Sequence, residues 1–238
     1  MKLDFRRKNI LITGASRGIG KSIANEFYKL GGNIFGTSTT KSFKKKRFEL
    51  IKVDFFKQDE LKNFCEYLKS KKIDILINNA GINKISSIDK ININDVRNIL
   101  YINLEIPTLI SSIVSKNMIK KKNGKIINIS SIFGLVSREK RSSYSSSKFG
   151  ILGLTKSSAL DLASYNILVN SISPGFIDTK LTRKILKLSG MKKMSKVVPI
   201  KRLGKVKEIA YLSMFLASSY NTYITGQNIV IDGGFTSK

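Results

Sequence analysis

The chain has 238 residues, of which 42% are hydrophobic, so it can form one domain with a sizeable core and is too apolar to be disordered. It has no histidine, which excludes a histidine-based zinc site and a Ser-His-Asp triad, and its single cysteine, Cys65, excludes an internal disulfide bond. The net charge of +27 indicates either an acidic partner or the lysine-rich composition of an AT-rich genome, and the scattered lysines favour composition.

The chain opens with a strand, a glycine-rich turn and a helix. Residues 10–12 form a short apolar run, as a strand buried on both faces does. Gly14, Gly18 and Gly20 follow, and apolar residues then recur at helical spacing until Gly31. Glycines let the backbone approach a pyrophosphate, whose charge the helix N-terminus favours. The segment therefore predicts a nucleotide-binding site.

The spacing Gly-x-x-x-Gly-x-Gly in residues 13–20 resembles the cofactor loop of the short-chain dehydrogenase/reductase family. The resemblance covers essentially the whole chain. It implies a single doubly wound, Rossmann-type α/β domain over residues 1–238, with a seven-stranded, mostly parallel sheet and helices on both faces. It also implies a homotetramer or homodimer. The loop residues expected to contact the cofactor are Gly14, Ser16, Arg17, Gly18, Ile19 and Gly20.

The end of the second expected strand, residues 33–37, bears on the choice of cofactor. An acidic residue there would bond the ribose 2′-hydroxyl of NAD, but the sequence continues with Thr37, Ser38 and hydroxyl residues up to Lys41. Arg17 lies in the glycine loop nearby and suits a 2′-phosphate, unless it is only solvated. We therefore expect NADP(H) to be preferred, with NAD(H) also accepted, and Thr37 and Ser38 to contact the cofactor.

The middle of the chain is expected to complete the cofactor site. Asp54 resembles the family's adenine-contacting aspartate. Asn78 begins an Asn-Asn-Ala-Gly motif, which in the family stabilises the sheet and lines the nicotinamide ribose. The resemblance therefore implies that Asn79, Ala80 and Gly81 contact the cofactor. Strands are expected at residues 49–53, 73–77 and 125–129, helices at 58–70 and at 93–116 with an irregularity at Pro107, and at most a turn or two of helix at 42–47.

Four residues carry the expected chemistry. Tyr144 and Lys148 are four positions apart, so a helix places them on one face, and Ser131 ends the fifth strand. By the family resemblance, Tyr144 exchanges a proton with the substrate oxygen and Ser131 hydrogen-bonds that oxygen. Lys148 lowers the tyrosine pKa, ordinarily about 10, and grips the nicotinamide ribose. Asn103 holds a water that links the lysine to solvent.

The C-terminal third is expected to close the site. A sixth strand at residues 167–173 leads into a segment in which Pro174, Gly175, Ile177 and Thr179 are implied cofactor contacts. Residues 181–198 are basic and weakly periodic, and we interpret them as a mobile lid over the substrate. A helix at 205–217 and a seventh strand at 228–231 follow.

The resemblance implies reversible reduction of a ketone to a secondary alcohol. Residues 36–38, 174–179, 202–204 and 223–226 are most similar to 3-oxoacyl-(acyl carrier protein) reductases, which act on a substrate carried by an acidic protein. Most of these stretches recur in sugar and polyol dehydrogenases, and the charged residues 137–141 suit a sugar phosphate, so that alternative stays open. A regulator that only senses the cofactor is disfavoured, because such proteins typically lack the tyrosine or the lysine and this chain has both Tyr144 and Lys148.

We expect a cytoplasmic protein that binds neither a membrane nor nucleic acid and holds no metal. No run of about 20 uninterrupted apolar residues occurs, and the apolar run near the N-terminus is far too short for a signal peptide. No helix-turn-helix or RNA-binding signature is evident.

Overall fold

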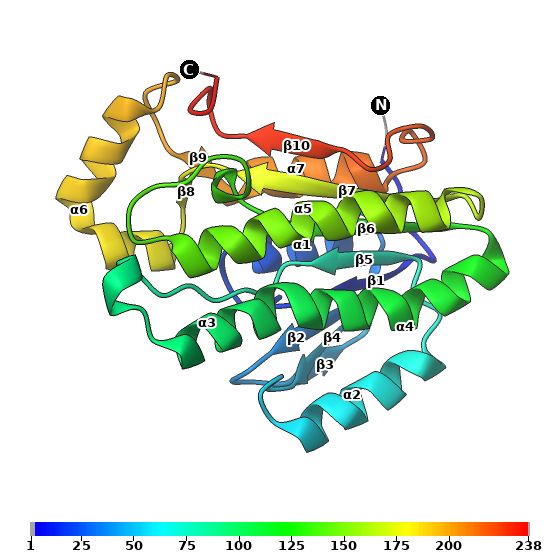
Figure 1. Cartoon of the computed structure of the whole chain (residues 1–238). Coiled ribbons are helices and arrows are strands. Elements are labelled where there is room, and N and C mark those ends of the chain that lie inside the picture. The colour runs from blue at the N-terminus through cyan, green and yellow to red at the C-terminus, as the bar shows by residue number, and fades with distance from the viewer. Residues whose placement is uncertain (1–2, 238) are drawn as a thin grey trace.

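The computed structural model describes residues 3–237 and confirms a single doubly wound α/β domain. Its main sheet has the strand order β10-β7-β6-β5-β1-β2-β4-β3, with all pairings parallel except that of β3 with β4 (Figure 1). The strands are β1 (Asn9–Ile12), β2 (Asn33–Ser38), β3 (Phe43–Lys45), β4 (Phe48–Lys52), β5 (Ile75–Asn78), β6 (Gly124–Ile129), β7 (Ile167–Pro174) and β10 (Asn228–Ile231).

The predicted number of seven strands was wrong, because the sheet has eight. The seven predicted strands are present, and the additional strand is β3, in the segment where a turn or two of helix was expected. A short hairpin forms there because Phe43 packs its ring on Phe48 of β4, with 5.2 Å between the ring centroids. Lys44 also lies 3.9 Å from the Glu49 carboxylate, so cross-strand contacts outweigh the weak local helix preference.

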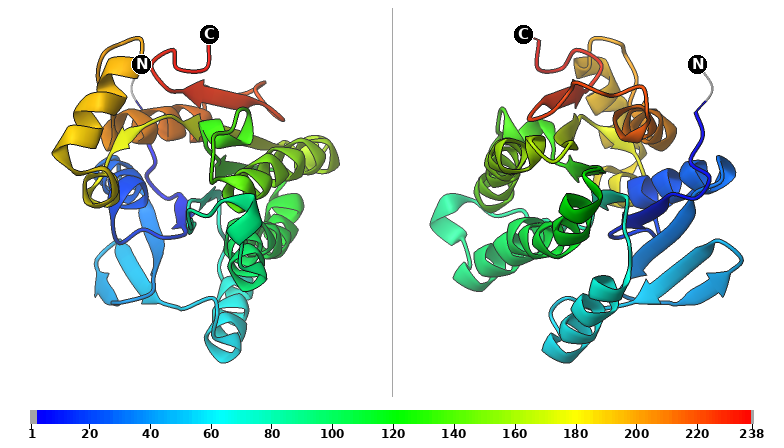
Figure 2. Two further views of the ribbon diagram at one scale, coloured as in Figure 1. Left: turned by 60° about the vertical axis from the view of Figure 1, so that its left-hand side comes forward. Right: turned by 90° about the vertical axis from the view of Figure 1, so that its right-hand side faces the viewer.

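Helices cover both faces of the sheet (Figure 2). On one face lie α1 (Gly18–Lys29) and α7 (Val206–Ala217), and on the other α2 (Gln58–Ser70), α4 (Ile106–Lys121) and α5 (Ser142–Ala163). The strands alternate between the two cores: in β1, Ile10 and Ile12 pack toward α1, whereas Leu11 packs toward α4. All three side chains are fully buried, which stabilises the fold by roughly 1.5–3 kcal/mol for each.

The predicted helix over residues 93–116 is interrupted earlier than expected. It consists of α3 (Ile93–Leu100), a π-helical segment η2 (Tyr101–Glu105) and α4. Pro107 lies directly after η2 within the continuous helical stretch Ile93–Lys121, so its missing N–H removes a helical hydrogen bond there, in agreement with the expected irregularity. The π-helical segment carries Asn103, whose side chain is buried.

The helical stretch Ile93–Lys121 is, by length and composition, long and apolar enough to cross a membrane, with a mean hydropathy of 1.2 in its most apolar window. In that window 44% is buried inside the protein. Its C-terminal part, α4, packs against α2 and β6, so its apolar side chains belong to the core of the domain.

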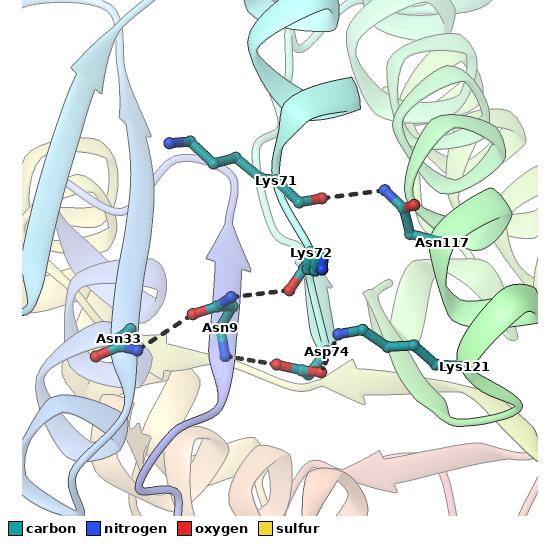
Figure 3. Close-up of polar contacts among 7 residues, drawn as sticks. All are labelled: Asn9, Asn33, Lys71, Lys72, Asp74, Asn117 and Lys121. Carbon is teal, nitrogen blue, oxygen red and sulfur yellow. Dashed lines mark hydrogen bonds and ion pairs between the residues drawn. The ribbon is translucent and has the colours of Figure 1, made fainter.

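A polar network joins the amino ends of the strands (Figure 3). The Asp74 carboxylate accepts a hydrogen bond from the Asn9 backbone N–H at 2.8 Å and pairs with Lys121 Nζ on α4 at 2.8 Å. The Asn9 side chain donates to the Lys72 carbonyl and accepts from the Asn33 amide. The network ties β1, β2, β5 and α4 together at the edge opposite the glycine loop.

The carboxyl ends of the strands carry the remaining elements. A second sheet pairs β8 (Ile177–Asp178) with β9 (Gly204–Lys205), and α6 (Lys180–Val197) projects on the side to which β7 and β10 point (Figure 1). The expected lid region is thus helical, with a break at Lys187, whose φ is +54°. Its movement stays a prediction. Short 3-10 turns occur at η1 (Ile88–Lys90) and η3 (Ile132–Gly134).

Candidate active site

The glycine loop after β1 is held in shape by its neighbours. Gly14 has φ +67°, and its N–H donates to Thr37 Oγ1 at 2.9 Å. A Cβ on Gly20 would collide with the Gly14 carbonyl oxygen and with the amide of Asn79, so only glycine lets α1 begin this close to the loop. From β5, Asn79 donates its side-chain amide to the Thr13 and Gly14 carbonyls and fixes the turn from the other side.

The N-terminus of α1 fits an anionic group such as a pyrophosphate. The N-cap residue Arg17 makes no side-chain cap, and the first turn, Gly18–Gly20, contains no acidic residue. The N–H groups of that turn are therefore not satisfied by a cap and point out of the helix end, where the helix dipole favours negative charge. Ser16 and Ile19 flank this end, and Thr179 lies across from it, with its methyl group about 3.9 Å from the Gly18 position.

The residues expected to set cofactor choice lie in the loop after β1 and at the carboxyl end of β2. Arg17 is exposed and forms no ion pair within residues 3–237. Thr37 and Ser38 are buried and already engaged: Thr37 Oγ1 accepts from Gly14, and Ser38 Oγ accepts from the backbone N–H of Lys41. Their side chains thus shape the loop, which leaves Arg17 and Lys41 as the exposed cations there. Asp54 ends β4 and accepts from the Phe56 N–H at 3.1 Å.

The Asn-Asn-Ala-Gly segment has two structural parts. Asn78 is buried and donates to Ser111 Oγ and Asn128 Oδ1, joining β5 to α4 and β6. The backbone N–H groups of Asn79 and Ala80 both donate to Thr13 Oγ1 at 2.9 Å. Gly81 then passes close to Asn103, since a Cβ there would lie 3.3 Å from Asn103 Oδ1. The segment therefore connects the glycine loop to the catalytic candidates.

The segment after β7 also reaches the glycine loop. Pro174 ends β7, and the Gly175 N–H donates to the Ile231 carbonyl of β10. Ile177 is buried, and Thr179 caps α6 by accepting from the Thr182 N–H at 3.1 Å. Only Thr179 of these four is shown near the loop, at Gly18.

Ser131, Tyr144 and Lys148 converge at the carboxyl end of β6. Ser131 follows the strand and accepts from the Phe133 N–H at 3.2 Å. Tyr144 and Lys148 lie on successive turns of α5, with Lys148 Nζ 5.7 Å from the centre of the tyrosine ring. Lys148 Nζ donates to the Ile129 carbonyl at 2.8 Å, and the Ser131 side chain lies close enough to the Tyr144 phenol to lower its pKa. The structure thus brings the three groups together.

Burial controls the pKa values of both groups on α5. Burial lowers the pKa of Lys148 from 10.5 to about 8. Burial also raises the pKa of the Tyr144 phenol above its ordinary value, although the Ser131 side chain and the charge of Arg141 oppose the shift. This differs from the expectation that Lys148 would hold the tyrosine pKa down. The phenol is therefore protonated near neutral pH, the form needed to give a proton to a carbonyl oxygen.

Asn103, on η2, connects the loop after β5 to α5. Its Oδ1 accepts from the Ile82 N–H at 2.8 Å, and its amide donates to the Ile82 carbonyl and to Ser147 Oγ. Ser147 Oγ in turn donates to the Tyr144 carbonyl at 2.7 Å. In this structure Asn103 therefore positions the Ile82 loop and α5.

The structure places three further residues in or beside the site: Thr13 and Ser147, which were not predicted there, and Arg141, which was expected only as part of a segment suited to a sugar phosphate. Thr13 clamps the Asn-Asn-Ala-Gly segment, Ser147 links Asn103 to α5, and the half-buried guanidinium of Arg141 lies near the Tyr144 phenol. Ser147 and Arg141 are each three positions from Tyr144, so helical spacing could have indicated both. Within residues 3–237, no group of three His, Cys, Asp or Glu side chains is placed to hold a metal ion.

Comparisons with known proteins agree with this geometry. A family model described as "Enoyl-(Acyl carrier protein) reductase" matches residues 14–236. A relative from Buchnera aphidicola subsp. Schizaphis graminum, named 3-oxoacyl-(acyl-carrier-protein) reductase FabG, is 39% identical over 98% of each chain.

Two solved structures show the same fold over nearly their whole length. The aldohexose dehydrogenase of Thermoplasma acidophilum superposes with a TM-score of 0.91 at 31% identity, covering 98% of this chain and 95% of that one. A gluconate 5-dehydrogenase from Burkholderia cenocepacia, solved in complex with NADP and tartrate, has a TM-score of 0.90 at 27% identity, covering 100% and 98%. The chain therefore belongs to the short-chain dehydrogenase/reductase family and is an oxidoreductase that uses a nicotinamide cofactor.

Proposed function

We propose that the chain is an NADP(H)-dependent reductase that interconverts a 3-oxoacyl thioester, carried by an acyl carrier protein, and the corresponding secondary alcohol. The observation that carries the proposal is the convergence of Ser131, Tyr144 and Lys148 at one strand end. It occurs in a chain whose relatives, matched over nearly their whole length, are named 3-oxoacyl-(acyl-carrier-protein) reductases.

The side chains divide the chemistry among them. Ser131 would hydrogen-bond the substrate oxygen, and Tyr144 would donate its proton to that oxygen during reduction or accept it during oxidation. Lys148 would exchange its hydrogen bond to the Ile129 carbonyl for one to the nicotinamide ribose. Asn103 would hold α5 in position through its hydrogen bond to Ser147. The bound cofactor supplies or accepts the hydride.

The preference for NADP(H) is argued from charge. No carboxylate stands at the end of β2, and Arg17, at the entrance of α1, is exposed without an acidic partner in the described chain. A guanidinium there would bind the ribose 2′-phosphate of NADP through two N–H groups, which the 2′-hydroxyl of NAD cannot match. NAD(H) would bind more weakly, and Arg17→Ala would narrow the difference in Kd.

A sugar, sugar phosphate or polyol is the second candidate substrate. It is supported by the structural likeness to dehydrogenases named for aldohexose and gluconate. The sequence around residues 137–141, which lies at the start of α5, also differs from the reductase pattern and carries three cationic side chains.

We further propose a homodimer or homotetramer in the cytoplasm, assembled through the long helices. The outer face of α5 carries Leu160, 81% exposed, and Phe149, 48% exposed, which an interface between copies would cover.

A substrate screen that follows NADPH absorbance tests these proposals. It compares acetoacetyl thioesters, keto sugars and sugar phosphates, each with NADPH and NADH. We expect turnover of the thioesters and a lower Kd for NADPH. Reduction of sugars alone would establish the second candidate. Stoichiometric NADPH binding without turnover of any ketone would instead indicate a cofactor-sensing protein.

A further inference from the structure

A solvent-open cavity of about 440 Å³ lies between the segment that leads into α5 and the loop around Ile88. One wall is the segment leading into α5, with Arg138, Glu139, Lys140 and Arg141, and the other wall includes Ile88. The two walls are joined by a hydrogen bond from the Ser86 N–H to the Lys140 carbonyl, at 3.3 Å. The cavity has the volume of roughly fifteen liquid waters, so it admits a substituent larger than a single small ion.

The cavity lining is cationic and its charges are not neutralised. Within residues 3–237, no carboxylate forms an ion pair with Arg138, Lys140 or Arg141, and Glu139 forms none either. Arg141 is half-buried, with its guanidinium 5.8 Å from the Phe133 ring centre. Burial, and then the charge of Arg138, lower the pKa of Arg141. Partial burial of the Arg141 guanidinium without a counterion is unfavourable, and an anion bound in the cavity would offset part of that cost.

A hydroxyl group adds to this set of donors. Ser142 Oγ lies at the start of α5 on the cavity wall, is buried, and has no hydrogen-bond partner in the described part of the chain. Two guanidinium groups, an ammonium and a hydroxyl offer more donors than a carboxylate can accept. A phosphate monoester, with up to two charges and three terminal oxygens, matches them better.

We propose that this cavity binds the phosphate group of a phosphorylated ketone substrate. The proposal rests on the proposed function for the position of the reacting carbonyl at Tyr144, which lies in the first turn of α5, three residues after its N-cap Arg141. Two sources share this chemistry: the 4′-phosphate of a phosphopantetheine arm bearing the acyl group, and the phosphate of a keto-sugar phosphate.

Calorimetry on the full chain saturated with NADP tests the proposal through two matched pairs of ligands. One pair is pantetheine and 4′-phosphopantetheine, and the other is a ketohexose and its 6-phosphate. Saturation with NADP keeps the phosphates out of the cofactor loop. We expect the phosphorylated member of at least one pair to bind about tenfold more tightly, the effect of one or two charge-assisted hydrogen bonds.

Two double variants test whether the tighter binding of the phosphorylated ligand depends on the cavity. Arg138→Gln combined with Lys140→Gln should abolish the preference for the phosphorylated ligand. The matched control, Lys62→Gln with Lys207→Gln, removes the same charge from exposed positions on α2 and α7 and should retain the preference. The proposal is overturned if neither pair shows a preference in the parent protein, or if the cavity variant keeps it.

Turnover separates this proposal from the proposed function. Reduction of acetoacetyl-pantetheine without any effect of the 4′-phosphate would leave the reductase function standing and overturn the phosphate site. A preference confined to the sugar pair, with no thioester reduced, would support the site and overturn the carrier substrate.

Discussion

Tyr144 and Lys148 illustrate how burial acts on single residues. Both side chains belong to α5, and burial favours the neutral form of each, lowering the lysine pKa to about 8 and raising the pKa of the phenol. Near neutral pH the proton therefore rests on the phenol, which suits ketone reduction. Oxidation needs the phenolate, so it requires additional positive charge near Tyr144, and we expect it to be favoured at higher pH.

Tyr144→Phe removes the proton donor and keeps most of the ring packing. We expect kcat for ketone reduction to fall by about 100- to 10,000-fold, the usual contribution of a general acid, with little change in the Kd for NADPH. Steady-state kinetics and a cofactor titration measure the two quantities. Tyr165→Phe, on an exposed tyrosine just beyond α5, is the control and should retain activity. Substantial activity in Tyr144→Phe would mean that another group protonates the oxygen.

Lys148→Met gives a test of the lysine pKa through stability. Between pH 8 and 10.5 the native lysine has lost its proton while the unfolded chain still binds one, so parental stability rises with pH in this window. Methionine lacks this dependence. The free energy of unfolding of the variant should therefore exceed that of the parent most below pH 8, by up to about 3 kcal/mol. This difference should disappear by pH 10.5. Urea unfolding at several pH values measures it, and a pH-independent difference contradicts the assigned pKa.

At the scale of elements, the site depends on where strands end and helices begin. The β1–α1 junction is tight because Gly20 lies against the Gly14 carbonyl, and the π-helical segment η2 turns Asn103 inward toward Ile82 and Ser147. A π-helical turn inserts one residue into a helix and so changes which side chains face the interior. These junctions place the binding and catalytic groups at the carboxyl ends of the strands.

Gly20→Ala tests the β1–α1 junction. The added Cβ collides with backbone at Gly14, which cannot move aside as a flexible side chain would, so the loop must open. We expect NADPH affinity to fall by at least about tenfold, equivalent to ~1.4 kcal/mol, with some loss of stability. Gly153→Ala, on α5 with open space around the position, is the matched control and should leave NADPH affinity unchanged. Unchanged NADPH affinity in Gly20→Ala would show that the cofactor still binds when Gly14 and the start of α1 are farther apart.

The network at the amino ends of the strands should contribute to stability without affecting catalysis (Figure 3). Asp74→Ala leaves the Asn9 N–H and the Lys121 ammonium without their carboxylate, which should lower the free energy of unfolding by roughly 1–3 kcal/mol. Denaturant unfolding measures the loss, and kcat of the folded enzyme should not change. Asp161→Ala, on the exposed surface of α5, is the control. A fall in kcat would reveal coupling across the sheet.

The whole molecule carries 43 basic and 16 acidic side chains. Whatever its origin in composition, such a charge attracts an acidic carrier protein over distances comparable to the Debye length, about 10 Å at 0.1 M salt. A neutral free thioester feels no comparable force. The charge therefore bears on the encounter with the carrier more than on the chemistry at Tyr144.

Charge reversal at exposed lysines on α2 and α7 tests this steering. Lys62→Glu with Lys207→Glu should raise KM for the carrier-linked thioester several-fold at low salt and leave KM for a short free thioester unchanged, because only the carrier is acidic. The effect should diminish as the salt concentration rises. Equal effects on both substrates would point to a general disturbance of the fold, and no effect on the carrier thioester would argue against an acidic carrier.

The sequence alone predicted seven of the eight strands of the main sheet, the helices on its two faces and the resemblance to the family. It did so because apolar periodicity, glycine turns and the Tyr144–Lys148 spacing are local properties of the chain. The four catalytic candidates were named from sequence, and the structure brings Ser131, Tyr144 and Lys148 to one strand end, although their roles stay predictions.

Only the tertiary structure decided the features that depend on distant partners. The strand β3 exists because Phe43 and Lys44 meet Phe48 and Glu49 across a hairpin, and no periodicity within three residues could show it. The direction of the Tyr144 pKa follows from the burial of its phenol, and the cationic cavity forms because the Arg141 segment meets a loop from another part of the chain. Burial and counterions are set by side chains that only folding brings into contact.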